Sequence, residues 1–269
     1  MGILSDALDR HEREKETEQQ VAQGEARPVS VQIPLPAEHS NKLVILSSPD
    51  SPEAESFKTL RSHLMFPSDR VRPRTIMVTS TFPGEGKTFV AANLAVSIAL
   101  GIDEHVLLVD CDLRRSHVHK MFGYAESEGL HEYLVGKRDL AELLIRTKID
   151  KLSLLPAGHL PHNPTELLSS ARMAAFLTEV KDRYQDRFIV LDSTPSLVTA
   201  ESNILAKFVD GIVLVVMAQR SPRKTIQRTL QNLGKEKILG VVFNGFRGAR
   251  KDYNKYYQRY YRANPSTQD

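Results

Sequence analysis

The sequence lacks the features that mark a secreted, membrane-spanning or nucleic-acid-binding protein. It contains one cysteine, Cys111, in 269 residues, so it has no disulfide framework and a reducing compartment is expected. Its longest apolar run, residues 212–218, has the length of a strand and falls short of the ~20 residues that cross a bilayer. The N-terminus lacks the long apolar core of a cleavable signal. A net charge of +3 is too small to indicate nucleic acid as a partner.

Residues 80–88 read Ser-Thr-Phe-Pro-Gly-Glu-Gly-Lys-Thr, which is typical of a phosphate-binding loop. Gly84 and Gly86 allow backbone N–H groups to turn inward around a phosphate chain. Lys87 brings a positive charge to the β- and γ-phosphates, and the Thr88 hydroxyl is placed to ligate Mg²⁺. The segment therefore predicts binding of a nucleoside triphosphate.

The surroundings of this loop support the prediction. The full motif has glycine where this chain has Thr81, but the cradle of glycines and lysine is intact. The loop follows an apolar segment, residues 75–79, and leads into a strongly helical segment, residues 89–100, which Gly101 ends. We therefore expect a strand, a phosphate loop and a helix that starts at the lysine.

Two further motifs place carboxylates after apolar segments. Asp110 and Asp112 close the first, and in an extended chain both point to one side while Cys111 points to the other. Two aspartates beside a triphosphate suit Mg²⁺ ligation or proton acceptance. Asp192 closes the second motif and is expected to hold Mg²⁺ through water. A single strand-end aspartate is usually a cap or turn residue, but three beside a phosphate loop indicate a shared site.

Six segments are continuously apolar rather than alternating, as expected for strands of a parallel sheet that is covered on both faces. They are residues 75–79, 106–110, 152–155, 188–192, 211–217 and 238–243. Helices are expected between them: one is capped by Asn163, with Pro164 in its first turn and Glu166 three residues after the cap, and another starts at residues 221–222. The pattern predicts an α/β fold with a doubly wound, mainly parallel sheet.

The chain divides into three predicted zones. Residues 1–40 are expected to form a short docking helix with a Pro-containing flexible linker, or a disordered tail without a role. The helical alternative rests on four apolar residues at helical spacing, Ile3, Leu4, Ala7 and Leu8. Residues 41–247 form the single α/β domain, and residues 248–269 form a polar, basic, tyrosine-rich tail.

Three motifs together resemble the bacterial tyrosine kinases of exopolysaccharide export, which are relatives of the MinD/ParA P-loop ATPases. They are Pro-Gly-Glu-Gly-Lys-Thr (83–88), Val-Asp-Cys-Asp-Leu-Arg (109–114) and Leu-Asp-Ser-Thr-Pro (191–195), which this family calls Walker A, Walker A′ and Walker B. The resemblance runs from about residue 43 to residue 262. The leader and the missing membrane span look most like the soluble, exosortase-associated branch, whose activating membrane protein is a separate chain.

The resemblance implies roles for individual residues. ATP is expected to contact Pro83, Gly84, Glu85, Gly86, Lys87, Thr88, Phe89 and Asn244, with a cap or turn role as the alternative for Asn244. Mg²⁺ is expected to be held by Thr88, Asp110 and Asp192. The implied catalytic set is Lys87, Asp110, Asp112, Asp192 and Arg114. Asp110 is the first candidate for the proton acceptor and Asp112 the second, while Arg114 either balances phosphate charge or pairs with a carboxylate.

The tail concentrates five of the eight tyrosines, Tyr253, Tyr256, Tyr257, Tyr260 and Tyr261, among basic residues. Tyrosine usually packs its ring and hydrogen-bonds its hydroxyl, so core formation explains this cluster poorly. An aromatic, basic surface helix or an RNA-contacting tail are the alternatives. We predict that the five are phosphate acceptors, which their basic neighbours draw toward an anionic ATP, and that each phosphate adds about −1.5 to −2 charge.

The implied function is that of an ATP-dependent protein-tyrosine autokinase that regulates exopolysaccharide polymerisation and export. One rival is a MinD/ParA-like ATPase that acts as a spatial switch; that group carries an extra lysine at the place of Phe82 and lacks the tyrosine tail. The other is a non-catalytic regulator that needs ATP only to bind a membrane partner. The intact Lys87, Asp110 and Asp192 argue against the second rival.

The resemblance also implies partners. Glu55, Lys58 and Arg61 occupy the place of the family's Glu-x-x-Arg-x-x-Arg helix, which joins subunits in a ring, although Lys58 lacks the bidentate fork of arginine. A solvated helix face with an internal ion pair is the alternative. We expect a homo-oligomer, a separate membrane-embedded polysaccharide co-polymerase and a cognate tyrosine phosphatase as partners, and no nucleic acid. The expected location is cytoplasmic, at the inner face of the cell membrane.

Overall fold

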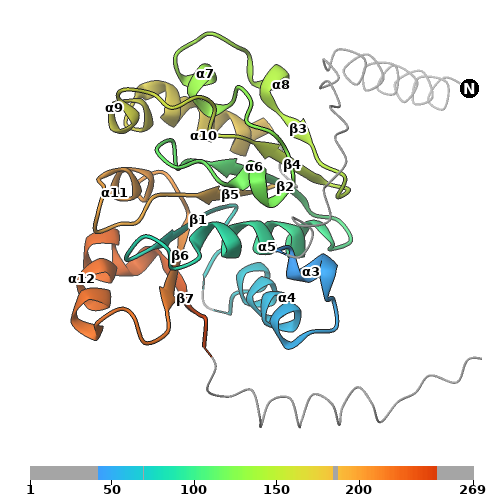
Figure 1. Ribbon diagram of the computed structural model, residues 1–269, viewed down its shortest axis with the longest axis vertical. Coiled ribbons are helices and arrows are strands. Elements are labelled where there is room, and N and C mark those ends of the chain that lie inside the picture. Colours follow the sequence, from blue (N-terminus) through green and yellow to red (C-terminus); the bar gives the residue numbers. More distant parts are fainter. Residues whose placement is uncertain (1–41, 69, 184–186, 247–269) are drawn as a thin grey trace, which may run out of the picture.

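The computed structural model describes residues 42–68, 70–183 and 187–246, and these form one sheet with helices on both faces (Figure 1). The predicted leader, residues 1–40, and the predicted tail, residues 248–269, lie outside the described residues. The division of the chain into three zones therefore stays a prediction.

The sheet has seven strands in the order β3-β4-β2-β5-β1-β6-β7, and every pairing except β3–β4 is parallel. Their bounds are β1 Thr75–Ser80, β2 His105–Asp110, β3 Ile145–Arg146, β4 Leu152–Leu155, β5 Arg187–Asp192, β6 Gly211–Met217 and β7 Ile238–Asn244. The six predicted strands are confirmed to within one residue at each end, and so is the doubly wound α/β class. The short antiparallel edge strand β3 was missed, because two residues carry no hydrophobic period.

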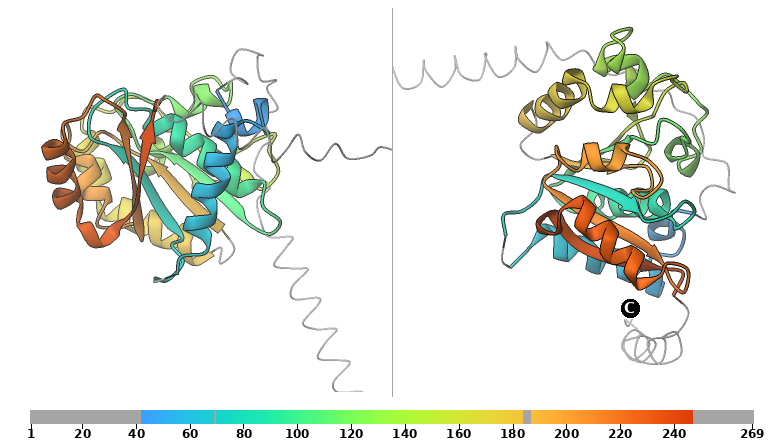
Figure 2. Two further views of the ribbon diagram at one scale, coloured as in Figure 1. Left: turned by 90° about the horizontal axis from the view of Figure 1, so that it is seen from below. Right: turned by 90° about the vertical axis from the view of Figure 1, so that its left-hand side faces the viewer.

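Ten α-helices and one 3₁₀ turn are found in the described part of the chain. They are α3 Val44–Ser47, α4 Pro52–Met65, α5 Lys87–Ala99, α6 Val118–Met121, α7 Leu130–Leu134, α8 Leu140–Leu143, α9 Pro164–Leu168, α10 Ala171–Arg183, α11 Glu201–Leu205, α12 Arg223–Leu233 and the turn Lys235–Lys237. Apolar side chains of α3 to α6 pack on one face of the sheet and those of α7 to α12 on the other. Figure 2 shows the sheet between α4 and α12.

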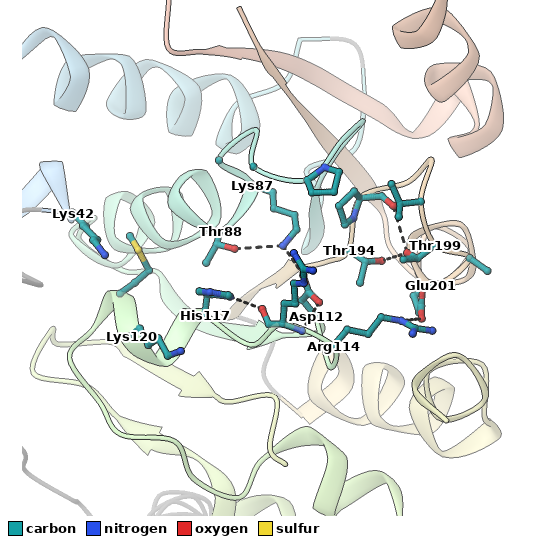
Figure 3. Close-up of a pocket in the computed structure, with 18 residues that line it drawn as sticks. Lys42, Lys87, Thr88, Asp112, Arg114, His117, Lys120, Thr194, Thr199 and Glu201 are labelled. Carbon is teal, nitrogen blue, oxygen red and sulfur yellow. Dashed lines mark hydrogen bonds and ion pairs between the residues drawn. The ribbon is translucent and has the colours of Figure 1, made fainter. Parts of the chain in front are cut away.

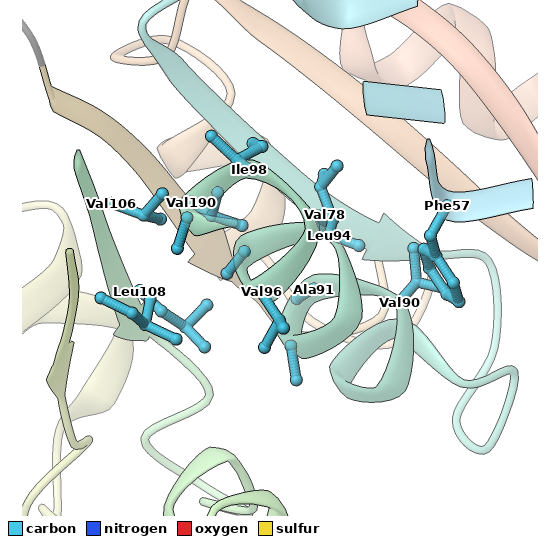
Figure 4. Packing of buried hydrophobic residues seen from close by; sticks show 14 of the residues in the cluster. Phe57, Val78, Val90, Ala91, Leu94, Val96, Ile98, Val106, Leu108 and Val190 are labelled. Carbon is cyan, nitrogen blue, oxygen red and sulfur yellow. The ribbon is translucent and has the colours of Figure 1, made fainter. Parts of the chain in front are cut away.

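Two hydrophobic cores result, because successive side chains of a strand point to opposite faces of the sheet. On β2, Val106 and Leu108 join the core beneath α5, whereas Leu107 and Val109 join the core on the side of α10. Figure 4 shows α5 lying across the first of these faces. Strands that are buried on both faces need apolar residues at every position, which is why the sequence pattern was continuous rather than alternating.

The helix starts were predicted with mixed success. Helix α5 begins at Lys87, as expected. Helix α9 begins at Pro164 with Asn163 at the N-cap position, as predicted, and the Asn163 carbonyl accepts from Leu167 N–H at 3.2 Å. The Asn163 side chain, however, makes no capping hydrogen bond. Helix α12 begins at Arg223, one residue after the predicted pair, and Ser221 does not cap it.

We predict that Leu94→Ala, in the centre of α5, lowers the free energy of unfolding by about 2–5 kcal/mol. Leu94 is fully buried between α5 and the sheet, and a cavity at such a site adds to the lost transfer free energy. Leu100→Ala, just beyond the end of the same helix at a residue that is 53% exposed, should change stability by about 0.5 kcal/mol or less. Urea titration of both variants is the measurement, and equal midpoints would contradict this account of the core.

Candidate active site

The segment between β1 and α5 has the conformation that a phosphate cradle requires. Gly84 and Gly86 adopt φ values of 79° and 93°, in the left-handed region that glycine tolerates and other residues rarely adopt. Helix α5 starts at Lys87 directly after the second glycine. The amides of the loop and the positive end of the 13-residue helix therefore favour an anion at this point.

The side chain of Glu85 anchors this loop instead of facing a ligand. It is fully buried, and its Oε2 accepts from Phe82 N–H at 2.7 Å. Its Oε1 accepts from Met217 N–H at 3.1 Å and from the Ser221 hydroxyl. One carboxylate thus ties the loop to the end of β6 and to the residues that precede α12. Any contact of Glu85 with ATP would have to come from its main chain.

Asn244, at the end of β7, braces the same loop. Its Nδ2 donates to the Glu85 carbonyl at 2.9 Å, and its Oδ1 accepts from Gly245 N–H at 2.9 Å. The turn role that was the alternative for Asn244 is therefore present in the structure, and the contact with adenine stays a prediction. Gly86 lies so close that an added Cβ would stand 2.1 Å from the Asn244 Nδ2.

Lys87 lies between two of the predicted carboxylates. Its Nζ is 2.8 Å from the Asp112 Oδ2 and 3.9 Å from the Asp192 Oδ1. Burial alone would lower the pKa of Lys87, but the charges of Asp192 and Asp112 raise it above its usual value. The lysine therefore stays positively charged at neutral pH, as phosphate binding requires.

Asp110 and Asp192 are register partners on neighbouring strands, which brings the two predicted carboxylate motifs together. Asp110 is fully buried; its Oδ1 accepts from Asp112 N–H, and its Oδ2 accepts from the Ser116 hydroxyl and from two further main-chain N–H groups, all at 3.0–3.1 Å. Burial and the nearby Asp192 raise the pKa of Asp110 to about 7. In this arrangement Asp110 holds the loop that leads from β2 to α6. Cys111 points into the opposite core, as the alternation predicted.

Asp192 is the residue that best fits a metal ion. It is fully buried, and neither carboxylate oxygen accepts a hydrogen bond from the described residues. Burial raises the pKa of Asp192, while Lys87 and the nearby Thr88 hydroxyl favour its ionised form. A buried carboxylate without donors beside a hydroxyl and a phosphate loop is the oxygen set that Mg²⁺ takes, with water and phosphate oxygens completing its shell.

A cavity of about 790 Å³ opens beside these groups (Figure 3). The phosphate loop, the residues after β2 and the residues after β5 line it. Of the residues predicted for the site, the lining includes Pro83, Gly84, Gly86, Lys87, Thr88, Asp112 and Arg114. The lining does not include Glu85, Phe89, Asp110, Asp192 or Asn244. The Phe89 ring instead packs edge-on against Phe57, with the ring centroids 5.8 Å apart.

Arg114 pairs with a carboxylate, which was one of its two predicted roles. Its Nε donates to the Glu201 Oε1 at 2.8 Å, and Thr165 Oγ1 donates to the same oxygen at 2.9 Å. Burial would raise the pKa of Glu201, but hydrogen bonds from Thr199, Arg114 and Thr165 hold it below its usual value. The pair closes one side of the cavity and joins the residues after β2 to α11.

Several lining residues were not predicted as site residues from the sequence: Lys42, Arg115, His117, Lys120, Thr194, Thr199 and Glu201. Arg115, His117 and Lys120 follow the Walker A′ motif within eight residues of Asp112, so their proximity along the chain was the available signal. Lys42 had no such signal, because it reaches the cavity only through the fold. Its carbonyl accepts from the Asn93 Nδ2 on α5 at 3.0 Å.

The helix proposed for subunit contact is α4. Lys58 Nζ lies 3.2 Å from the Glu55 Oε2, which is the internal pair of the alternative interpretation. Arg61 donates from Nη1 to the Ser97 carbonyl of α5 at 2.7 Å. The five tail tyrosines lie outside the described residues.

We predict that Gly86→Ala weakens binding of a non-hydrolysable ATP analogue at least about tenfold. A side chain at this left-handed position costs about 1–2 kcal/mol, and its Cβ would also displace Asn244. Gly240→Ala on β7 is the matched control, because nothing lies within 4 Å of an added Cβ there. Titration calorimetry compares the two, and equal affinities would contradict the cradle assignment.

Comparison with known sequences identifies the family. The family described as an AAA domain matches residues 73–237. Tyrosine-protein kinase YwqD of Bacillus subtilis is 32% identical over 217 residues, which are 80% of this chain and 90% of that protein. Tyrosine-protein kinase wzc of Salmonella typhimurium is 30% identical over 225 residues, which are 82% of this chain and 31% of that protein. The chain likewise spans only 28% and 30% of the length of two EpsB relatives from Ralstonia.

Solved structures of kinase domains and of a P-loop ATPase have a similar fold. The chimerical protein CapA2B2 has a TM-score of 0.71 at 31% identity, covering 77% of this chain and 91% of that chain. The kinase domain of the Escherichia coli tyrosine kinase ETK has a TM-score of 0.70 at 30% identity, covering 76% and 79%. The cell division ATPase MinD of Pyrococcus furiosus has a TM-score of 0.53 at 25% identity, covering 63% and 71%. The resemblance inferred from the three motifs is thus confirmed: the chain has a P-loop ATPase fold and belongs to the family of bacterial tyrosine-protein kinases.

Proposed function

We propose that the protein is an ATP-dependent protein-tyrosine autokinase that transfers the γ-phosphate of ATP to the tyrosines of its C-terminal tail. The observation that carries this proposal is the meeting of Lys87, Asp112 and the buried Asp192 at the phosphate loop. Phosphoryl transfer needs positioning and charge neutralisation above all, and these groups supply both. The tyrosine cluster supplies an acceptor, and membership of the tyrosine-kinase family supports the assignment.

Binding of ATP would replace Asp112 as the partner of the Lys87 ammonium. The β- and γ-phosphates would take the loop amides and the Lys87 ammonium, which is now paired with Asp112. Release of Asp112 from this pair would leave a carboxylate facing the cavity. Thr88 and Asp192 are the residues that would hold Mg²⁺, which neutralises charge on the transferring phosphate.

In the transfer step the tyrosine oxygen attacks the γ-phosphorus, the bond from that phosphorus to the β–γ bridging oxygen breaks, and ADP leaves. The phenol has a pKa near 10, so a carboxylate that takes its proton helps the attack at neutral pH. Asp112 lines the cavity, whereas both oxygens of Asp110 hold the loop after β2. This difference favours Asp112 as the acceptor of the proton, with Asp110 as the residue that positions it.

The cellular role follows from the family. We propose that the protein regulates the polymerisation and export of an exopolysaccharide, and that it does so as a homo-oligomer at the inner face of the cell membrane. A separate membrane-embedded co-polymerase and a cognate phosphatase are the proposed partners. No helix among the described residues is long and apolar enough to span a membrane. A ring contact through α4 would have Glu55 and Lys58 at the surface, while Arg61 would first have to leave the Ser97 carbonyl.

We predict that Lys87→Met and Asp192→Ala each reduce autophosphorylation at least about 100-fold while the domain stays folded. The first removes the cation for the phosphates, and the second removes the metal ligand. Asp110→Ala should also abolish most labelling, because the loop that carries Asp112 loses its anchor. Lys137→Met, at an exposed residue that does not line the cavity, is the control. Normal phosphotyrosine in folded Lys87→Met protein would disprove the kinase assignment.

A second prediction separates acceptor from catalyst. Changing Tyr253, Tyr256, Tyr257, Tyr260 and Tyr261 to Phe should remove most phosphotyrosine and leave ATP affinity within about twofold, because no tail residue is assigned to the nucleotide. Mass spectrometry after incubation with Mg-ATP maps the label. Label on Tyr124, Tyr133 or Tyr184 in this variant would show that the tail is not the main acceptor. ATP hydrolysis without any label in the wild type would instead favour the switch ATPase.

A further inference from the structure

We propose that three cations in the lining of the cavity, Lys42, Arg115 and Lys120 (here the basic wall), form a phosphotyrosine-binding site that retains a tail already phosphorylated once. The inference rests on the proposed kinase function and adds a step to it: the first phosphotyrosine is held while further tyrosines of the same tail react. The site is separate from the loop that binds the phosphates of ATP.

The lining of the cavity carries more positive than negative side chains. The lining contains five Lys and Arg side chains, Lys42, Lys87, Arg114, Arg115 and Lys120, against two carboxylates, Asp112 and Glu201. In this structure Asp112 is matched by Lys87 and Glu201 by Arg114. When a nucleotide takes Lys87, the freed Asp112 offsets one further positive charge, and the lining keeps a net positive charge. Three cations remain, and none of them forms an ion pair with a described residue. An excess of positive charge in the lining of one cavity favours an anionic ligand.

The fold ties the backbone of these three residues to the catalytic elements. The carbonyl of Lys42 is held by Asn93 of α5, the helix that begins at Lys87. Arg115 N–H donates to Asp112, both to its Oδ1 at 3.0 Å and to its carbonyl at 3.2 Å. Lys120 belongs to α6, whose first residue, Val118, donates its N–H to Asp110. A phosphate bound on this wall would therefore lie at a fixed position relative to the transfer site.

The lysines Lys42 and Lys120 lie away from the place where the phosphates of ATP are expected. Figure 3 shows Lys42 and Lys120 on one side of the cavity and Arg114 with Glu201 on the other, with Lys87 and Asp112 between them. The phosphates of ATP are taken by the loop and Lys87 near the middle. A second phosphate group is needed to occupy the side wall. Met121 also lines the cavity next to Lys120 in the chain, and a thioether is a favourable neighbour for an aromatic ring.

The chain itself supplies a ligand with this chemistry. Before reaction the tail is basic, with Arg250, Lys251, Lys255, Arg259 and Arg262 among its tyrosines, so three free cations do not attract it. One phosphate adds about −1.5 to −2 charge and three strong acceptor oxygens, which Lys and Arg bind well. Affinity for the wall thus arises only after the first transfer. The expected product is a tail with several phosphates rather than many tails with one.

The test uses full-length protein whose tail has been dephosphorylated, with Mg-ADP present, and two fluorescent peptides of residues 250–262. One peptide carries phosphotyrosine at position 256 and the other is unmodified. Fluorescence anisotropy should show the phosphopeptide binding at least about tenfold more tightly. The triple variant Lys42→Ala, Arg115→Ala, Lys120→Ala should bind both peptides alike while keeping its affinity for ADP. Lys224→Ala, an exposed lysine of α12 outside the cavity, is the matched control and should behave as wild type.

A kinetic readout complements binding. In mass spectra taken early in autophosphorylation, wild type should show tails with two or more phosphates beside unmodified tails, and the triple variant should pass through singly modified tails first. Equal affinity of wild type for both peptides, or an equal loss in Lys224→Ala, would overturn the inference. If the wild type labels its tail but fails these binding tests, only the inference fails. An absence of any tail label would instead remove the proposed function.

Discussion

The electrostatics of the site depend on the parallel pairing of β2 with β5. This pairing places Asp110 directly opposite Asp192 in the interior of the protein. Two buried carboxylates on adjacent strands repel each other, and burial disfavours their ionised forms. Lys87 offsets this cost by standing close to Asp192 while it pairs with Asp112. The phosphate loop, the start of α5 and the loop after β2 are all arranged around this one cation. The same electrostatic arrangement makes the site receptive to a metal ion and to phosphate.

Much of the fold could be read from the sequence, because the relevant signals are local. Five of the six predicted strands are largely buried on both faces and are therefore apolar throughout, whereas the edge strand β7 is apolar although Val241 and Phe243 are exposed. The glycines of the phosphate loop must adopt left-handed conformations. Strand β3 was missed since two residues carry no pattern. Asn163 was placed correctly at the N-cap of α9, but its side chain makes no capping hydrogen bond, because residue type gives the capacity to cap but not the side-chain rotamer that achieves it.

The candidate site could be predicted only as far as its motifs extend. The three Walker motifs meet at one place, as the sequence indicated. The sequence does not, however, distinguish a carboxylate that faces the cavity, Asp112, from one that holds a loop, Asp110. Two residues of the cavity lining are held there by tertiary contacts: Glu201 accepts from Arg114, and the Lys42 carbonyl accepts from Asn93. These contacts join residues 87 and 51 positions apart in the chain, and no local rule predicts them.

At Glu85 the fold restricts which amino acid is suitable, although the phosphate-loop motif does not. The phosphate-loop pattern accepts any amino acid there, yet this carboxylate receives three donors that come from the loop itself, from the end of β6 and from the residues before α12. Substitution at this position is therefore limited by the sheet edge behind the loop rather than by the nucleotide in front of it. A shorter or uncharged side chain at 85 would leave the Met217 amide and the Ser221 hydroxyl without their acceptor, and only the second of these donors belongs to a side chain that substitution could remove.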